Sequence, residues 1–225
     1  NIEYISDSNN HNSIIVGISH SRANQVIFKH NDLEDLEQKL KISWGQGKTP
    51  CVVFESVYSM DGDCGHIQEI CNLADKYKAI TYIDEVHAVG LYGEKGGGKL
   101  EQLGLQDRVD IVNGTLGKAL GGAMGGFTSG RKEIVELLRQ RSRPYLFSNT
   151  LAPSITGASL AVLELLSETT ELRDTLENNT RYFREKIQAA GFDIKAGEHA
   201  IVPIMLYDAV LSQKMAEKLL ERGIY

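Results

Sequence analysis

The stretch AITYIDEVHAVG, residues 79–90, runs from a short, mostly apolar segment into an aspartate and a histidine. Its first part has the length and composition of a buried strand in a parallel sheet. The stretches PCVVFES, residues 50–56, and VDIVNG, residues 109–114, have the same character. Helical patterns are interleaved with these runs, so the sequence predicts an α/β protein whose mostly parallel sheet is flanked by helices.

The helical patterns are recognised by apolar residues three and four positions apart. In residues 32–40, Leu33, Leu36 and Leu40 fall on one face, and either Asn31 or Asp32 is the expected cap. Residues 154–166 are more apolar, and we expect this helix to be buried. Further helices are predicted over 67–77, 131–140, 171–190 and 212–223, and further strands over 2–6, 125–130, 192–195 and 200–206.

The composition turns polar between Ser167 and Thr170, which favours a domain boundary there. We expect residues 1–165 to form a large domain that is incomplete at its N-terminus. Residues 166–225 are expected to form part of a smaller α+β domain. The chain enters a strand at once after Asn1 and ends just after a predicted helix stops at Gly223, which is typical of an internal piece of a longer polypeptide.

Composition excludes several classes of function. The 225 residues carry a net charge of −6, which argues against a general nucleic-acid binder. No apolar run is long enough to span a membrane, and no signal-peptide pattern is present. The three cysteines form no CxxC pair and fit free thiols in a reducing compartment, so we expect a cytoplasmic protein.

Polar side chains follow three of the predicted strands. Asp84 and His87 come after one, Thr115 and Lys118 after another, and Ser59 after a third. In open α/β sheets, ligands bind beyond the carboxyl ends of the strands. The sequence therefore predicts one crevice that receives an acid, an imidazole, two hydroxyl groups and an amine.

The lysine of this set lies in VNGTLGKALGG, residues 112–122, among small side chains. Such a surrounding suits pyridoxal phosphate (PLP), because a lysine forms a Schiff base with the cofactor aldehyde and small neighbours let the ring approach the backbone. An aspartate that pairs with the pyridinium nitrogen, here Asp84, keeps the ring protonated and electron-accepting. A hydroxyl such as that of Thr115 can donate to the phosphate.

Two other chemistries fit less well. Asp84 and His87 have a spacing that could serve a metal ion, but no third ligand lies at a convincing distance along the chain, so we expect no metal. Residues 93–100, GEKGGGKL, match the first seven positions of a phosphate-binding loop. The eighth position requires Ser or Thr and is Leu100, and the stretch does not join a strand to a helix, so nucleotide hydrolysis is not favoured.

Four motifs in order, NNHNSII at 9–15, SMDG at 59–62, DEVHAVGLYG at 84–93 and GTLGKA at 114–119, resemble those of the α-oxoamine synthases. These are PLP-dependent transferases of fold type I that condense a small amino acid, often glycine, with an acyl-CoA. The resemblance covers essentially the whole chain, which corresponds to the middle of the family's sequences. It implies that Lys118 is the Schiff-base lysine and the base for the glycine α-proton, and that Asp84 pairs with the pyridine nitrogen.

The resemblance also implies roles for further residues. His87 and Ser59 would lie near the phenolic oxygen of the cofactor, and Thr115 would bind its phosphate. His11 would stack on the ring face, although the next residue differs from the family's usual alanine. Ser148 and Asn149 would reach the phosphate of the cofactor in the other subunit, which implies a homodimer with shared active sites.

The two halves resemble different branches of the family. Residues 1 to about 98 resemble the 5-aminolevulinate synthases, which use succinyl-CoA, whereas the sequence from about residue 107 resembles the glycine C-acetyltransferases (2-amino-3-ketobutyrate CoA ligases), which use acetyl-CoA. The longer C-terminal match favours glycine and acetyl-CoA as substrates. A third alternative is a non-catalytic dimer-partner subunit, which the presence of Lys118, Asp84 and His87 disfavours.

Overall fold

The computed structural model describes residues 1–225, which divide into two compact units. The first unit comprises Asn1–Ser59 and Cys64–Asp174, and the second comprises Met60–Asp63 and Thr175–Tyr225. Each unit is described by itself below. A division of the complete protein into domains at residues 165 and 166 remains a prediction.

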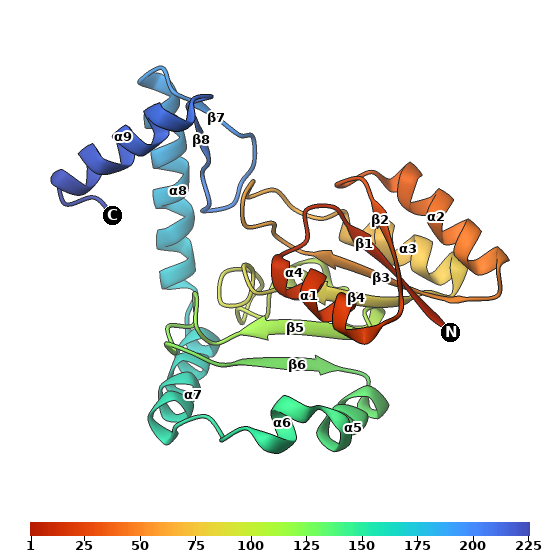
Figure 1. Ribbon diagram of the computed structural model, residues 1–225. Helices are drawn as coiled ribbons and strands as arrows, with labels where there is room; N and C mark the ends of the chain where they lie inside the picture. Colours follow the sequence, from red (N-terminus) through yellow and green to blue (C-terminus); the bar gives the residue numbers. More distant parts are fainter. The chain divides into compact units, whose positions relative to one another are not determined.

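The first unit is built on one six-stranded sheet with the order β2-β1-β3-β4-β5-β6. The strands from β1 to β5 are parallel, and β6 is antiparallel to β5. The mostly parallel sheet predicted from the sequence is therefore confirmed (Figure 1). The strands are β1 (Ile2–Asp7), β2 (Asn24–Phe28), β3 (Thr49–Glu55), β4 (Ile80–Asp84), β5 (Ile111–Thr115) and β6 (Gly126–Gly130).

Helices connect the strands, as the alternating pattern requires. Asp32, one of the two expected caps, begins the second helix, since its side chain accepts a hydrogen bond from the Asp35 N–H at 2.9 Å. Asn31 instead has a positive φ of 53°. The helices of this unit are α1 (Asn12–Ser21), α2 (Leu33–Gly45), α3 (Ile67–Tyr77), α4 (Lys99–Leu103), α5 (Lys132–Arg141), α6 (Arg143–Phe147) and α7 (Pro153–Glu168), with a 3₁₀ turn at Gln106–Arg108.

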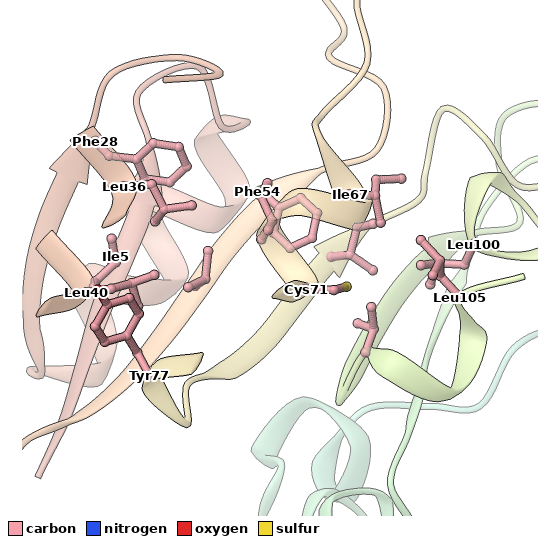
Figure 2. Packing of buried hydrophobic residues seen from close by; sticks show 14 residues of the cluster. Ile5, Phe28, Leu36, Leu40, Phe54, Ile67, Cys71, Tyr77, Leu100 and Leu105 are labelled. Carbon is pink, nitrogen blue, oxygen red and sulfur yellow. The ribbon is translucent and has the colours of Figure 1, made fainter. Parts of the chain in front are cut away.

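Helices α2 and α3 bury their apolar sides against one face of the sheet. Figure 2 shows this cluster, which includes Leu36 and Leu40 of α2, the strand residues Ile5 and Phe54, and Cys71 of α3. Leu36, Leu40, Ile5 and Phe54 are completely buried. Burial of a side chain of this size contributes about 1.5–3 kcal/mol, so the cluster anchors the strands whose ends carry the site.

The opposite face of the sheet is covered by α1. Ile14 and Ile18 of this helix pack with Cys51 and Val53 of β3. Alternate residues of a strand point to the same side, so Glu55 at the end of β3 belongs to the α1 face as well. This face carries the polar residues described in the next section.

Helix α7 differs from the sequence-based expectation. It forms where predicted, but Leu160, Leu163 and Leu165 are exposed, and only Ser159 and Leu166 are buried. The expectation that this helix is buried was therefore wrong. The apolar residues of α7 form a surface that no other part of this chain covers. No helix of the chain is both long and apolar enough to pass through a membrane.

The second unit contains most of α8 (Glu171–Ala189), the antiparallel pair β7 (Asp193–Ile194) and β8 (Ile204–Met205), and α9 (Ala209–Glu221). The predicted order of two strands and a helix after the long helix is confirmed. The Arg184 guanidinium group donates to the main-chain carbonyl groups of Lys195, His199 and Ile201, which fixes the loop between the two strands against α8.

Candidate active site

The carboxyl ends of β1, β3, β4 and β5 lie at one edge of the parallel sheet (Figure 1). Glu55 is the register partner of Asp84, and Asp84 is the register partner of Asn113. Residues paired in register on neighbouring strands point to the same face. The edge therefore carries a row of three polar side chains, on the face that α1 covers.

Lys118 and His87 meet at this edge. The lysine Nζ lies 2.9 Å from the histidine Nε2, although 31 residues separate them in the chain. Lys118 is exposed in the loop after β5, and its carbonyl group accepts the N–H of Gly121 at 2.9 Å. Gly121 has a φ of 64°, which glycine adopts without strain. The glycine-rich sequence thus turns sharply after Lys118 and leaves its amine accessible.

Asp84 lies at the end of β4 with 3% of its surface exposed. Its Oδ1 accepts the N–H of Val86 at 2.9 Å, which fixes the carboxyl group. Burial raises the pKa of Asp84, and the hydrogen bond from Val86 and the charges of Lys118 and His11 oppose this rise. A buried carboxyl group in this position gains strongly from a further cationic partner, such as a protonated ring nitrogen.

Glu55 is a site residue that the sequence analysis missed. It is 1% exposed, and its Oε1 accepts the main-chain N–H of His11. Burial is the main cause that raises the pKa of Glu55 to about 7; the charges of Asp84 and Asp7 also act to raise it, and the His11 hydrogen bond and the Lys118 charge oppose the rise. The signal in the sequence was a glutamate at the carboxyl end of the apolar run at 50–56.

His11 and Thr115 have defined local roles. His11 is the N-cap of α1, and its Nδ1 accepts the N–H of Ser13 at 3.2 Å. The Thr115 hydroxyl group donates to the carbonyl group of Gly125 at 3.1 Å and accepts the N–H of Gly117 at the same distance. Thr115 ends β5, in agreement with the predicted strand end, and His11 follows the loop after β1.

A cavity of about 720 Å³ lies beside β5 and β6. Asn113 and Thr115 of β5 line it together with Thr128 of β6, Arg139 of α5 and Tyr145 of α6. Its volume falls within the range of about 300–1,000 Å³ that small-molecule sites occupy. An arginine and several hydroxyl groups around one space suit a ligand that carries a phosphate.

Three predicted site residues make none of the contacts described above. Ser59 is half-buried in the turn that follows β3. Ser148 and Asn149 are exposed just after α6. The cofactor contacts expected of these three residues remain predictions.

The glycine-rich stretch at 93–100 is a loop that leads into α4, and the main-chain N–H groups of residues 95–100 are already bound. Glu101 accepts the N–H of Gly97, and Glu85 accepts that of Leu100 at 2.8 Å. A phosphate group at this loop would meet carboxylates instead of free donors. The geometry thus explains why a partial match to a phosphate-binding sequence forms no such site here.

The fold and the lysine site together define a class, the PLP-dependent transferases of fold type I, as predicted from the sequence. A family model described as aminotransferase class I and II matches residues 3–225, and the chain belongs to this family.

Named relatives and a solved structure agree with this assignment. The chain is 50% identical over 222 residues to a 2-amino-3-ketobutyrate coenzyme A ligase of Escherichia coli, a match that covers 98% of the chain and 56% of the relative. It is 47% identical over 221 residues to the mitochondrial enzyme of that name from Mus musculus, covering 98% of the chain and 53% of the relative. The chain thus spans about half the length of the curated relatives it matches.

A solved structure of a serine palmitoyltransferase variant from S. paucimobilis, with a bound PLP–myriocin aldimine, superposes with a TM-score of 0.92. The identity is 33%, and the match covers 99% of this chain and 58% of that one. The predicted resemblance to the α-oxoamine synthases is confirmed by these matches.

Proposed function

We propose that the protein to which this chain belongs is a PLP-dependent acyltransferase that condenses glycine with acetyl-CoA to 2-amino-3-oxobutanoate and CoA, and that catalyses the reverse cleavage. The observation that carries the proposal is the 2.9 Å contact between Lys118 and His87 beside the buried Asp84. The relatives named 2-amino-3-ketobutyrate coenzyme A ligase, at 47–50% identity, support the choice of substrates.

The residues at the sheet edge fit PLP. When bound, this cofactor supplies an electrophilic aldehyde carbon and a ring that accepts electron density. Lys118 has an accessible amine for covalent attachment of the aldehyde. Asp84 is a buried carboxyl group that cations stabilise in its charged form, and it would hold the ring nitrogen. Thr115 would bind the phosphate, and His11 would lie on the ring face.

The reaction needs a base that takes the α-proton of glycine. The Lys118 Nζ is the proposed base, and the His87 Nε2, 2.9 Å away, is placed to exchange a proton with it or to orient it. His87 and Ser59 would also contact the phenolic oxygen of the cofactor. The main-chain hydrogen bond from Val86 keeps the Asp84 carboxyl group in one orientation during proton transfer.

The active form that we propose is a homodimer. Ser148 and Asn149 are exposed in this chain, and they would contact the phosphate of the cofactor held by the other subunit. We place the protein in the cytoplasm, and cell fractionation tests this assignment against the mitochondrial compartment named for the mouse relative.

Two alternatives are kept. A 5-aminolevulinate synthase, which uses succinyl-CoA, is favoured by the resemblance of residues 1 to about 98 to that branch. Succinyl-CoA differs from acetyl-CoA by a methylene and a negatively charged carboxylate, so charge as well as length separates the two acyl donors. A non-catalytic dimer-partner subunit is opposed by the presence of Lys118, Asp84 and His87.

The deciding experiment measures CoA release by the intact protein with glycine and either acetyl-CoA or succinyl-CoA. A preference for acetyl-CoA supports the proposal, and a preference for succinyl-CoA replaces it by the first alternative. The Lys118→Ala variant is the control and should lose both turnover and the visible absorbance of bound PLP. A wild-type protein that is colourless and inactive would favour the non-catalytic dimer-partner subunit.

A further inference from the structure

We propose that Glu55 is a positioning residue whose carboxyl group fixes the main chain of His11 and thereby sets where the His11 ring lies relative to the cofactor. Glu55 touches neither reacting group in the mechanism above, and it acts through another residue. The part of this inference that concerns the cofactor rests on the proposed function.

The geometry of the sheet places Glu55 at the centre of the site. Its register partner on β4 is Asp84, so the two carboxyl groups lie on the same face at the carboxyl edge. Asp84 is the residue proposed to hold the ring nitrogen. A side chain beside Asp84, such as that of Glu55, is well placed to support a residue that lies over the same ring.

The hydrogen bond joins two segments that are far apart in the chain. The His11 N–H donates to Glu55 Oε1 across 44 residues. His11 also begins α1, because its carbonyl group accepts the N–H groups of Ile14 and Ile15 at 3.0 and 3.3 Å. The carboxyl group of Glu55 therefore fixes the point where the chain turns from the loop after β1 into the helix.

This bond connects His11 itself to the strand ends. The ring itself is exposed, and its side-chain hydrogen bonds go to Ser13 within the same turn. A local cap of this kind orients the ring relative to α1 but not relative to the sheet. The contact with Glu55 ties the main chain of His11 directly to the end of β3, in addition to the packing of α1 on β3 and the hydrogen bond from the Asn10 side chain to the Val53 carbonyl group.

The burial of Glu55 explains why its carboxyl group holds the loop after β1 in place. A carboxyl group that is 1% exposed costs free energy unless it is hydrogen-bonded, so the loop after β1 is held where it satisfies the acid. Burial raises the pKa of Glu55 to about 7, so near neutral pH part of the population carries a proton. Either form can accept the His11 N–H, and an amide oxygen in the same place can do so as well.

Glu85 offers a matched control. It is as deeply buried as Glu55, with 0% exposure, and burial also raises the pKa of its carboxyl group. Its oxygens accept the N–H groups of Lys99 and Leu100 at 3.1 and 2.8 Å, so it holds the glycine-rich loop and not the segment of His11. A general loosening of the fold should follow from either substitution, but a displaced His11 only from a change at Glu55.

The first test is hydrogen–deuterium exchange of residues 8–14 in the apo form of the intact protein. Three variants are compared, namely Glu55→Gln, Glu55→Asp and Glu55→Leu. Gln keeps an acceptor at the same reach, Asp keeps the acid but is one methylene shorter, and Leu removes the acceptor. We expect wild-type protection in the Gln variant and faster exchange of the His11 amide in the other two. If the Leu variant fails to fold, the Gln and Asp variants still decide.

The second test titrates PLP into the same proteins and follows the visible absorbance. The Asp and Leu variants should bind PLP about tenfold more weakly, the factor expected for one lost hydrogen bond, with a shifted absorbance maximum. The Gln variant should stay within about twofold of the wild type, and the Glu85→Leu control should keep wild-type affinity.

Three outcomes overturn the inference. One is wild-type exchange at His11 in the Asp and Leu variants. Another is wild-type PLP affinity in those variants, and the last is an equal loss of affinity in the Glu85→Leu control. A wild-type protein that binds no PLP contradicts the proposed function instead, and the exchange experiment then still tests the anchoring of His11.

Discussion

Replacing Glu55 by Gln should remove a defined part of the pH dependence of folding stability. Burial raises the pKa of the Glu55 carboxyl group from 4.5 to about 7. The folded protein then binds this proton more tightly than the unfolded chain does. The contribution to stability is fully present below about pH 4.5 and is lost as the pH rises through about 7.

The size of the effect follows from the pKa change. Each pH unit between the two pKa values is worth about 1.4 kcal/mol, so the wild type should lose about 3 kcal/mol of unfolding free energy across this window. The Gln variant has no proton to bind at this position. The unfolding free energy of Glu55→Gln minus that of the wild type should therefore rise by about 3 kcal/mol between about pH 4.5 and about pH 8.

Urea denaturation of the apo protein, followed by circular dichroism over this pH range, measures the difference. Glu217→Gln is the control, since it removes the same carboxyl group from an exposed position on α9 and should give a flat difference. A flat difference for Glu55→Gln would refute the argument, because the buried acid would then have the same pKa in the folded and unfolded chains.

Three further outcomes test the packing around the site. Leu36→Ala removes a completely buried side chain from the core and should lower the unfolding free energy by about 2–5 kcal/mol in urea denaturation. Gly65→Ala would place a Cβ 2.5 Å from the carbonyl oxygen of Glu55, so it should cost about 1–3 kcal/mol and weaken PLP binding, whereas unchanged stability would contradict the close approach. Cys64 is exposed, while burial raises the pKa of Cys51 to about 12, so Ellman's reagent should label Cys64 in the native protein and Cys51 only after unfolding.

The parts of the site that the sequence predicts are those that follow directly from strand ends. Asp84 and Thr115 terminate β4 and β5, and the two strands are neighbours in the sheet. Side chains a few residues beyond such neighbouring ends must converge, which is why His87 and Lys118 meet as expected. In the same way, the apolar runs of the strands and the leucine spacing of α2 predict which residues form the core.

The parts that the sequence did not predict depend on contacts between distant segments. Glu55 is buried at the end of β3, where the loop after β1 donates the His11 N–H to it. Strand β2, Asn24–Phe28, lies at the edge of the sheet and has mostly exposed residues, so its short sequence lacks a strong apolar pattern. Helix α7 has the composition of a buried helix and yet exposes its leucines, because composition does not say which molecule covers a face.

The wide spacing of the site residues along the chain also bears on how the protein folds. The contacts that define the site span 31 residues between His87 and Lys118 and 44 between His11 and Glu55. Contacts of this range form late, after the loop-closure entropy of several strands has been lost. A partly folded chain that lacks any one of β1, β3, β4 or β5 presents no complete site. A ligand bound at this edge would therefore favour the fully formed sheet alone, and its binding would report that folding of the first unit is complete.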